Sequence, residues 1–146
     1  MSTEEDVRKA SKQFYNALTQ MVKGDASLIE AIWLHDETVT SMHPIGGREV
    51  GWKAVKKSFE QVSGIASDGK VELKEQLIRV VGDMAYEVGI EAGQAEFAGD
   101  HVNIEHRVTN IYQRKDGIWK MIHHHADIAP AMVEILRKLQ HAAEHA

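Results

Sequence analysis

The stretch from Arg107 to Asp127, RVTNIYQRKDGIWKMIHHHAD, decides how the rest of the chain is interpreted. β-Branched and aromatic residues alternate with polar ones on both sides of Asp116-Gly117, which predicts two strands joined by a tight hairpin turn. The second strand ends in three consecutive histidines, His123 to His125. Three imidazoles at the end of a strand are unusual for simple packing. The stretch therefore predicts a sheet with a polar site on one face.

The composition is that of an ordinary globular protein. The 146 residues are 43% hydrophobic and 27% charged, which suits a single domain over residues 1–146 with a real buried core. A net charge of −5 argues against nucleic acid as a partner, and no apolar run approaches the roughly 20 residues of a membrane span. The chain has no cysteine, and residues 1–6 are acidic and lack the apolar core of a signal peptide. We therefore expect a cytoplasmic protein without disulfides or thiolate metal sites.

Helices are predicted in the first half of the chain and at its end. Apolar residues recur at helical spacing in four segments, which are residues 2–21, 25–33, 52–62 and 127–139. Ser2 and Glu5 have the spacing of a capping box at the start of the first helix. Asp127 is expected to cap the last helix, with Pro130 in its first turn.

After Gly69 the hydrophobic pattern changes to a period of two, which predicts strands. The expected strands are residues 71–81, 84–97, 101–115 and 118–126, preceded by a shorter strand over 38–42 that Pro44 and Gly46-Gly47 stop. Gly89 and Gly93 interrupt the second long strand and predict bulges or a sharp bend. The fold class is therefore α+β, with helices first and then a curved antiparallel meander.

This order of elements resembles the nuclear-transport-factor-2-like, or SnoaL-like, superfamily, which also contains ketosteroid isomerase and the association domain of calcium/calmodulin-dependent kinase II. The run from Arg114 to His125 resembles the Arg-Asp-Gly-x-Trp-x-x-Val-His-x-His run of the kinase domain, and residues 24–47 resemble the start of the family's domain. The resemblance covers nearly the whole chain. It implies a cone-shaped curved antiparallel sheet wrapped around a long N-terminal helix, a cystatin-like or SnoaL-like roll. It also implies an apolar pocket at the open mouth and a homodimer formed through the other sheet face.

The resemblance does not extend to the catalytic groups of ketosteroid isomerase. The residue before the Pro-x-Gly turn is the catalytic aspartate in that enzyme, and here the place is filled by His43. The position of the enzyme's helix-one tyrosine falls near Ala17, with Tyr15 offset. The strand that would hold the protonated acid carries no carboxylate on the face from Arg107 to Ile111. Steroid isomerisation is therefore not expected.

Strand periodicity sorts the candidate site residues. Since residues two apart share a face of a strand, His123 and His125 are expected to share one with Trp119, while His124 points to the opposite face. Arg107 and Thr109 share a face of the preceding strand, and with the two histidines they would form an anion-friendly pocket wall. The candidate catalytic residues are His43, His125 and Arg107. The expected ligand contacts are Trp33, Trp52, Thr109, His123 and Tyr15.

Each candidate also has a structural interpretation. Histidines on half-buried strands are often hydrogen-bonded structural residues, and Arg107 can pair with Glu91 or Glu105 in the sheet. A zinc site is not favoured, because adjacent strand residues diverge and no thiolates are present. We therefore expect no metal and no cofactor. His141 and His145 belong to the terminal amphipathic helix and are expected to be solvated.

Two classes of function remain open. The first is a small-molecule pocket protein, with cofactor-free acid/base chemistry of isomerase or lyase type by His43 and His125 on an apolar ligand that has an anionic or enolisable group. The second is a non-catalytic dimeric ligand-binding or association module. Whether the chain is an enzyme is left open, because one fold hosts many functions. The expected partners are a small-molecule ligand and a second copy of the chain, with no nucleic acid and no membrane. Residues available for the dimer face are Val88, Ile90, Val108, Tyr112 and Ile122.

Overall fold

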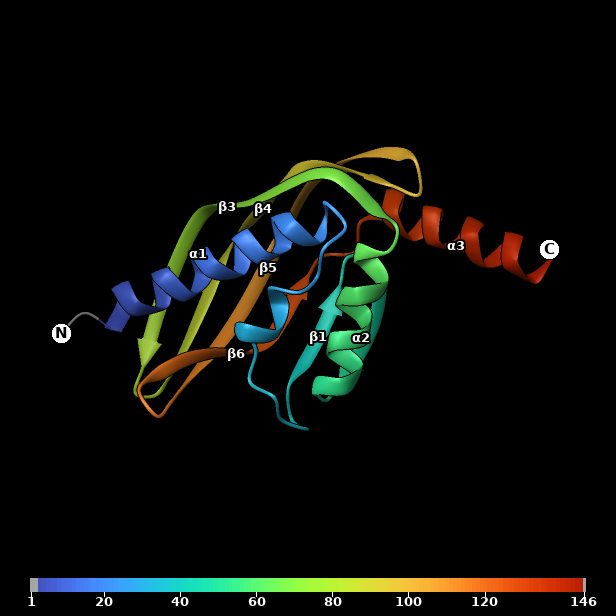
Figure 1. Ribbon diagram of the computed structural model, residues 1–146. Helices are drawn as coiled ribbons and strands as arrows, with labels where there is room; N and C mark the ends of the chain where they lie inside the picture. Colours follow the sequence, from blue (N-terminus) through green and yellow to red (C-terminus); the bar gives the residue numbers. More distant parts are fainter. Residues whose placement is uncertain (1–2, 146) are drawn as a thin grey trace.

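A long first helix lies across one face of a curved six-stranded sheet in the computed structural model, which describes residues 3–145 (Figure 1). The elements in chain order are α1 (Thr3–Met21), the 3-10 helix η1 (Ile29–Ala31), β1 (Thr40–His43), β2 (Gly46–Val50), α2 (Trp52–Ser63), β3 (Ala66–Val81), β4 (Met84–Phe97), β5 (Asp100–Lys115), β6 (Ile118–Ala126) and α3 (Pro130–Glu144). The expected α+β roll is confirmed. Ser2, predicted to cap the first helix, lies outside the described residues.

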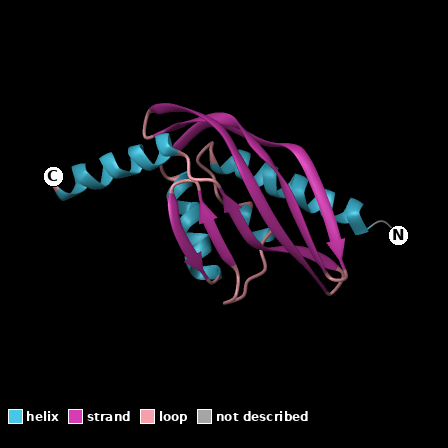
Figure 2. Ribbon diagram, turned by 180° about the vertical axis from the view of Figure 1, so that it is seen from behind, coloured by secondary structure: helices cyan, strands magenta, loops and turns pink. Residues whose placement is uncertain are grey.

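The strand order in the sheet is β2-β1-β6-β5-β4-β3. The four long strands form the expected antiparallel meander, while β1 pairs with β6 in parallel. Seen from behind, the sheet lies in front of both α1 and α2, so the two helices cover the same face (Figure 2). We call this covered face the inner face and the opposite one the outer face.

The sequence does not predict β2, because the Gly46-Gly47 pair indicates only the end of the preceding strand. Both glycines have positive φ angles, 93° and 84°, which reverse the chain so that the next residues pair back onto β1. The pair therefore starts a hairpin strand in addition to ending one.

Bulges in β3 produce the bend that the glycines of β4 predicted. The pairing of β3 with β4 shifts register between Ser67 and Lys70 and again between Lys74 and Leu77. Gly89 stands opposite the second bulge, and Gly93 pairs with Val71 next to the first. A Cβ on Gly93 would lie 1.8 Å from the carbonyl oxygen of Lys70. The backbones can approach this closely only where a side chain is absent. The bend curls the sheet around α1.

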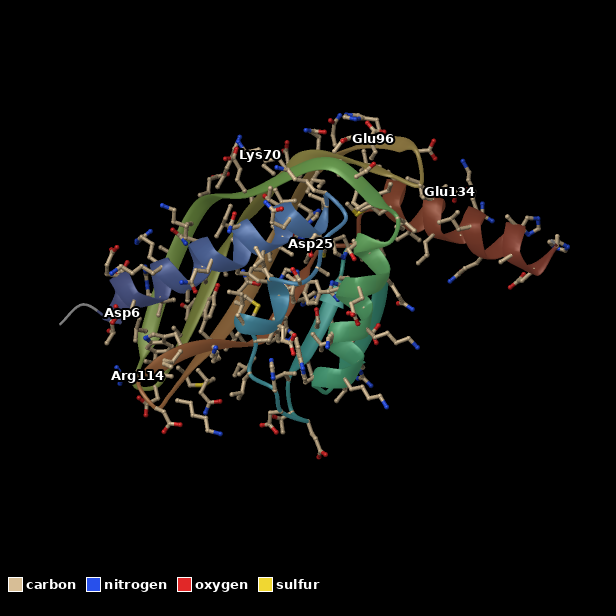
Figure 3. The ribbon with its side chains drawn as sticks, viewed as in Figure 1. Asp6, Asp25, Lys70, Glu96, Arg114 and Glu134 are labelled. Carbon is tan, nitrogen blue, oxygen red and sulfur yellow. The ribbon has the colours of Figure 1, made fainter. Side chains whose placement is uncertain are left out.

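The core fills the space between the inner face and the helices. Four of its aromatic residues, Phe14, Trp33, Phe59 and Trp119, are all buried. Phe14 packs edge-on against Phe59 at 6.4 Å between ring centroids, which joins α1 to α2. Figure 3 shows charged side chains such as Lys70 and Glu96 projecting away from this interior.

The last helix, α3, starts at Pro130 with Ala129 as its N-cap, so the predicted cap by Asp127 is wrong. Asp127 instead forms an ion pair with Arg107, 2.7 Å from its Nε. Only Met132 and Ile135 of the helix are buried, and the rest extends beyond the sheet (Figure 1). Within residues 3–145, no helix is long and apolar enough to cross a membrane.

Candidate functional site

A β-bulge in β6 reverses the predicted orientation of the three histidines. Ile111 pairs with His123 and Tyr112 with Met121, so Ile122 is an extra residue with no partner on β5. One extra residue moves every later side chain to the opposite face. Trp119 and Met121 point inward as expected, but beyond the bulge His124 is the inward residue, and His123 and His125 lie on the outer face.

The predicted pocket wall of Arg107, Thr109, His123 and His125 is therefore on the wrong side of the sheet. Arg107 is exposed and held by Asp127, and it pairs with neither Glu91 nor Glu105. With Thr109 and His125 it borders an open groove on the outer face. His43 is buried on the inner side. The prediction that these residues converge on one cavity is wrong. His43 lies on the inner side, whereas the register of β5 places Arg107 and Thr109 on the outer face, and the bulge places His123 and His125 there too.

The inner side of the sheet contains a small cavity that four ionisable side chains border. His43, Glu91, His106 and His124 line it, and about 50 Å³ is free inside. That space holds a few waters or a compact ligand. The remaining wall is apolar, with the side chains of α1, α2, the strands and α3 represented by Leu18, Met21, Phe59, Val62, Phe97 and Met132.

Glu91 and His106 form a buried pair in this wall. His106 Nε2 lies 2.7 Å from Glu91 Oε1, and the Tyr15 hydroxyl donates to Glu91 Oε2 at 2.8 Å. Burial alone would raise the pKa of Glu91, but the hydrogen bond from His106, the nearby imidazoles and the Tyr15 hydroxyl together hold that pKa below its ordinary value. Glu91 is therefore ionised at neutral pH, with both oxygens accepting.

The tautomer of His124 is set by Asn110. The Asn110 amide nitrogen donates to the Glu87 carboxylate at 2.9 Å and to Tyr15 at 3.0 Å, so its oxygen faces His124. His124 Nδ1 lies 2.6 Å from that oxygen and must donate to it, which leaves Nε2 unprotonated. Burial, opposed in part by the Glu91 charge, lowers the pKa of His124 to about 4.

His43 is held by a serine of α2. Ser58 donates its own hydroxyl proton to the Val55 carbonyl at 2.6 Å, so at 2.7 Å it accepts from His43 Nε2. The Nδ1 atom of His43 is then unprotonated. Burial, and after it the nearby His124, lowers the pKa of His43 to about 3. Both imidazoles are neutral over the physiological range.

A second buried carboxylate extends the polar network away from the cavity. Glu87 is 0% exposed and accepts hydrogen bonds from Gln76, Asn110 and the Tyr112 hydroxyl. Gln76 reaches it from a bulge of β3 and also donates to Ser11 of α1. Burial, and after it the Glu87 charge, raises the pKa of Tyr112 well above its ordinary value, so this tyrosine keeps its proton.

Three residues predicted to contact a ligand are placed elsewhere. Trp33 is buried against Phe59 and Trp52, and Trp52 stacks on His35 at 4.4 Å between ring centroids. Neither tryptophan lines the cavity. Tyr15 is offset from the cavity wall and contacts its lining residue Glu91 through a hydrogen bond.

Sequence reasoning missed Glu91, His106, Asn110 and the inward position of His124. One signal was available: on β5 the face that carries Val102, Ile104, Val108 and Tyr112 is the more apolar face, which favours it as the core side. His106 and Asn110 interrupt that apolar face. No comparable signal marks the bulge at Ile122.

The potential metal ligands of the described chain lie far from this network in the sequence. Within residues 3–145, the group of three close ligand atoms is formed by His141, Glu144 and His145 at the exposed end of α3. The imidazoles of the cavity form no such group among these residues. Each ring is hydrogen-bonded to a different partner, which is Ser58, Glu91 or Asn110.

Comparisons with known proteins agree with the fold. Three solved structures share the fold. The first is a proposed dehydratase of the nuclear transport factor 2-like family from Streptomyces avermitilis (24% identity, 86% of this chain and 95% of that chain covered, TM-score 0.74). The second is a proposed calcium/calmodulin-dependent protein kinase type II association domain from Thiobacillus denitrificans (24% identity, 84% of this chain and 94% of that chain covered, TM-score 0.66). The third is a proposed ketosteroid isomerase from Shewanella frigidimarina (20% identity, 82% of this chain and 92% of that chain covered, TM-score 0.66).

These identities are low, so the likeness shows the fold alone. A comparison with curated proteins finds no match to this sequence. Residues 7–131, most of the chain, match the SnoaL-like domain family. The curved sheet around α1, the inner cavity and this match together place the chain in the SnoaL-like domain family.

Proposed function

We propose that this protein binds a small, mainly apolar molecule in the inner cavity and catalyses a proton transfer on it without a cofactor. The observation that carries the proposal is the Glu91–His106 pair, a buried carboxylate 2.7 Å from an imidazole that borders an apolar cavity. Buried ionisable groups are costly unless they are paired or used, and this pair also faces free space. The reaction class it supports is isomerase- or lyase-like.

His106 is the base in this proposal, and Glu91 orients it. Since Glu91 accepts the Nε2 proton of His106, Nδ1 is the ring nitrogen left to take a proton from a ligand. The imidazolium that forms is stabilised by the adjacent carboxylate, as in other carboxylate–histidine pairs. The apolar walls exclude bulk water and strengthen this attraction.

Tyr15 is a positioning residue in this scheme. Its hydroxyl occupies Glu91 Oε2, so the carboxylate cannot rotate away from His106 without losing a 2.8 Å hydrogen bond. Burial, and after it the charge of Glu91, raises the pKa of Tyr15 well above its ordinary value, which keeps the donor protonated. Of the three catalytic candidates from the sequence, His43 remains in the site as part of the wall.

Solvent deuterium exchange tests the chemistry. Small neutral fragments that shift the methyl signals of Met21 and Met132, which line the cavity, are incubated in D2O and followed by mass spectrometry. His106→Gln should keep binding but lose about 100-fold or more of the exchange rate, the usual contribution of a general base. Exchange that is equally fast in wild type and His106→Gln would refute the proposal.

His101→Gln provides the matched control. His101 is on the same strand and also contacts a glutamate, with Nδ1 3.1 Å from Glu96 Oε1, but the pair is exposed and neither residue lines the cavity. This variant should exchange at the wild-type rate. Glu91→Gln should behave like His106→Gln, because a neutral amide does not stabilise the imidazolium.

A dimeric ligand-binding or association module is the second candidate, and the outer face favours it. Leu77 and Tyr86 of the outer face are 44% and 42% exposed, and monomers seldom leave extended apolar faces uncovered. Val88 and Ile90 border the same outer groove. Val108 and Tyr112 do not belong to this face, because both are buried on the inner side.

Light scattering tests the dimer. The 16.4 kDa chain should elute with twice that mass at micromolar concentration, and Tyr86→Asp should return it to the monomer mass. Leu139→Asp, at an exposed apolar residue of α3, is the control that should leave the mass unchanged. A wild-type monomer would reject this candidate.

A further inference from the structure

Each imidazole of the cavity wall has one N–H group that the protein already uses. His106 Nε2 donates to Glu91, His124 Nδ1 to Asn110, and His43 Nε2 to Ser58. The directions follow from partners that can only accept at those atoms, which are a carboxylate, an amide oxygen and a serine whose proton is committed to Val55.

The second nitrogen of each ring has no hydrogen bond within the described residues, and in a neutral ring it is an acceptor. Among residues 3–145, the one fully enclosed side-chain polar atom without a hydrogen bond is Trp33 Nε1, so these three nitrogens keep some open surface. All three rings are buried from outside and line the cavity. Their open surface therefore belongs to it.

The cavity wall offers these acceptors and no cation. No lysine or arginine lines it, and Arg107, expected to attract an anion, lies on the outer face. An anionic ligand would meet the Glu91 carboxylate and three lone pairs, and would be repelled. A hydroxyl or N–H group would instead satisfy acceptors that are unfavourable to leave unpaired in an apolar surrounding.

We propose that the cavity selects a compact neutral ligand that donates hydrogen bonds, an alcohol or a phenol with an apolar body, and excludes carboxylates. This inference rests on the proposed function of the cavity, and it reverses the preference for anions expected from the sequence. The donor binds the free nitrogens of His43 and His124, while the apolar body packs against Phe59. The hydroxyl hydrogen or a neighbouring C–H of the ligand then lies in the same cavity as His106, the proposed base.

A set of three probes of similar size tests the selection. Phenol donates a hydrogen bond, fluorobenzene has no donor, and benzoate is an anion at neutral pH. Binding is followed by the methyl signals of Met21 and Met132. Because the free space is about 50 Å³, the titrations are repeated in Met132→Ala, which widens the cavity and retains the Met21 signal.

Phenol should bind at least about tenfold more tightly than fluorobenzene, and benzoate should produce no shift, since sites built around hydrogen bonds reject ligands that leave them unpaired. Fluorobenzene or benzoate binding as tightly as phenol would overturn the inference and leave the cavity as a binding site. Failure of all three probes in both wild type and Met132→Ala would overturn the proposed function as well.

His43→Phe separates the acceptor from the shape of the wall. It should remove most of the preference for phenol over fluorobenzene, while His101→Phe, an exposed histidine of β5, should leave it unchanged. Should His43→Phe fail to fold, the imidazole 15N signals of wild type decide instead. Phenol is expected to shift the unprotonated nitrogens of His43 and His124, and unshifted signals at bound phenol contradict the inference.

Discussion

Two buried glutamates on the same face of β4, Glu87 and Glu91, have opposite surroundings. Glu87 accepts from neutral donors, Gln76, Asn110 and Tyr112, and borders no part of the inner cavity. Glu91 accepts from Tyr15 and from an imidazole, and it does border the cavity. We call the Glu87 side of the inner face the closed end and the Glu91 side, which borders the cavity, the cavity end. The free space beside Glu91 is what the proposed proton transfer requires, and Glu87 has none of it.

Asn110 joins the two ends. Its amide nitrogen contacts Glu87 and the Tyr15 hydroxyl, which in turn donates to Glu91, and its oxygen accepts from His124. The two glutamates therefore differ in their hydrogen-bond donors and in the free space beside them. Each glutamate, and the Asn110 link between them, can be substituted separately.

Removing the carboxylate at the closed end should have the largest effect. Glu87→Leu leaves three buried donors unpaired, and we expect the free energy of unfolding to fall by roughly 5 kcal/mol, at about 1–3 kcal/mol for each orphaned group. Urea denaturation followed by circular dichroism measures it. Glu91→Leu is the comparison and should lose about half as much, because water can enter the cavity beside His106. Equal losses would mean that the two ends do not differ.

The cavity end should make stability depend on pH. His43 and His124 have native pKa values of about 3 and about 4, against an unfolded value of about 6.5. As the pH falls below 6.5, the unfolded chain gains protons that the native protein does not, so the free energy of unfolding decreases until the pH nears the native values. From pH 7 to pH 5 the two groups together should lower it by roughly 4 kcal/mol.

Urea unfolding at a series of pH values checks this loss, and His124→Gln should roughly halve it while keeping a donor for Asn110. Glu91, whose pKa is lowered in the native protein, adds a further loss only as the pH drops through the ordinary glutamate range and below. A flat profile between pH 7 and pH 5 would show that the two imidazoles take up protons as readily in the folded protein as in the unfolded chain.

Cutting the link between the two ends should have an intermediate effect. Asn110→Leu removes the acceptor of His124 and a donor of both Glu87 and Tyr15, which should lower the free energy of unfolding by about 3 kcal/mol. It should also release the tautomer of His124, visible as a mixture of Nδ1–H and Nε2–H forms in 15N spectra. A single unchanged tautomer would show that Asn110 does not set it.

The outer face should tolerate loss of its ion pair. Arg107 is 81% exposed at its side chain where it contacts Asp127, and solvent screens such pairs. Arg107→Ala should leave the melting temperature and the cavity methyl signals unchanged. Altered ligand binding in this variant would return Arg107 to the candidate site.

Much of the fold could be predicted because its signals are local. The bounds of β4 and β6 follow from alternation and from glycine turns, and the buried aromatic core follows from helical spacing in α1 and α2. The short strand β2 could not be predicted, because it is held by pairing with β1 and has no apolar pattern of its own.

The amino-acid sequence by itself determined the family, the order of elements and the presence of a histidine-rich strand. Which histidine faces the interior was decided by the tertiary structure, because the single unpaired residue Ile122 exchanges the two faces of β6. The proposed catalytic pair was likewise decided there. Glu91 and His106 are neighbours only through the register of β4 with β5, and Tyr15 reaches them only because the bent sheet wraps around α1.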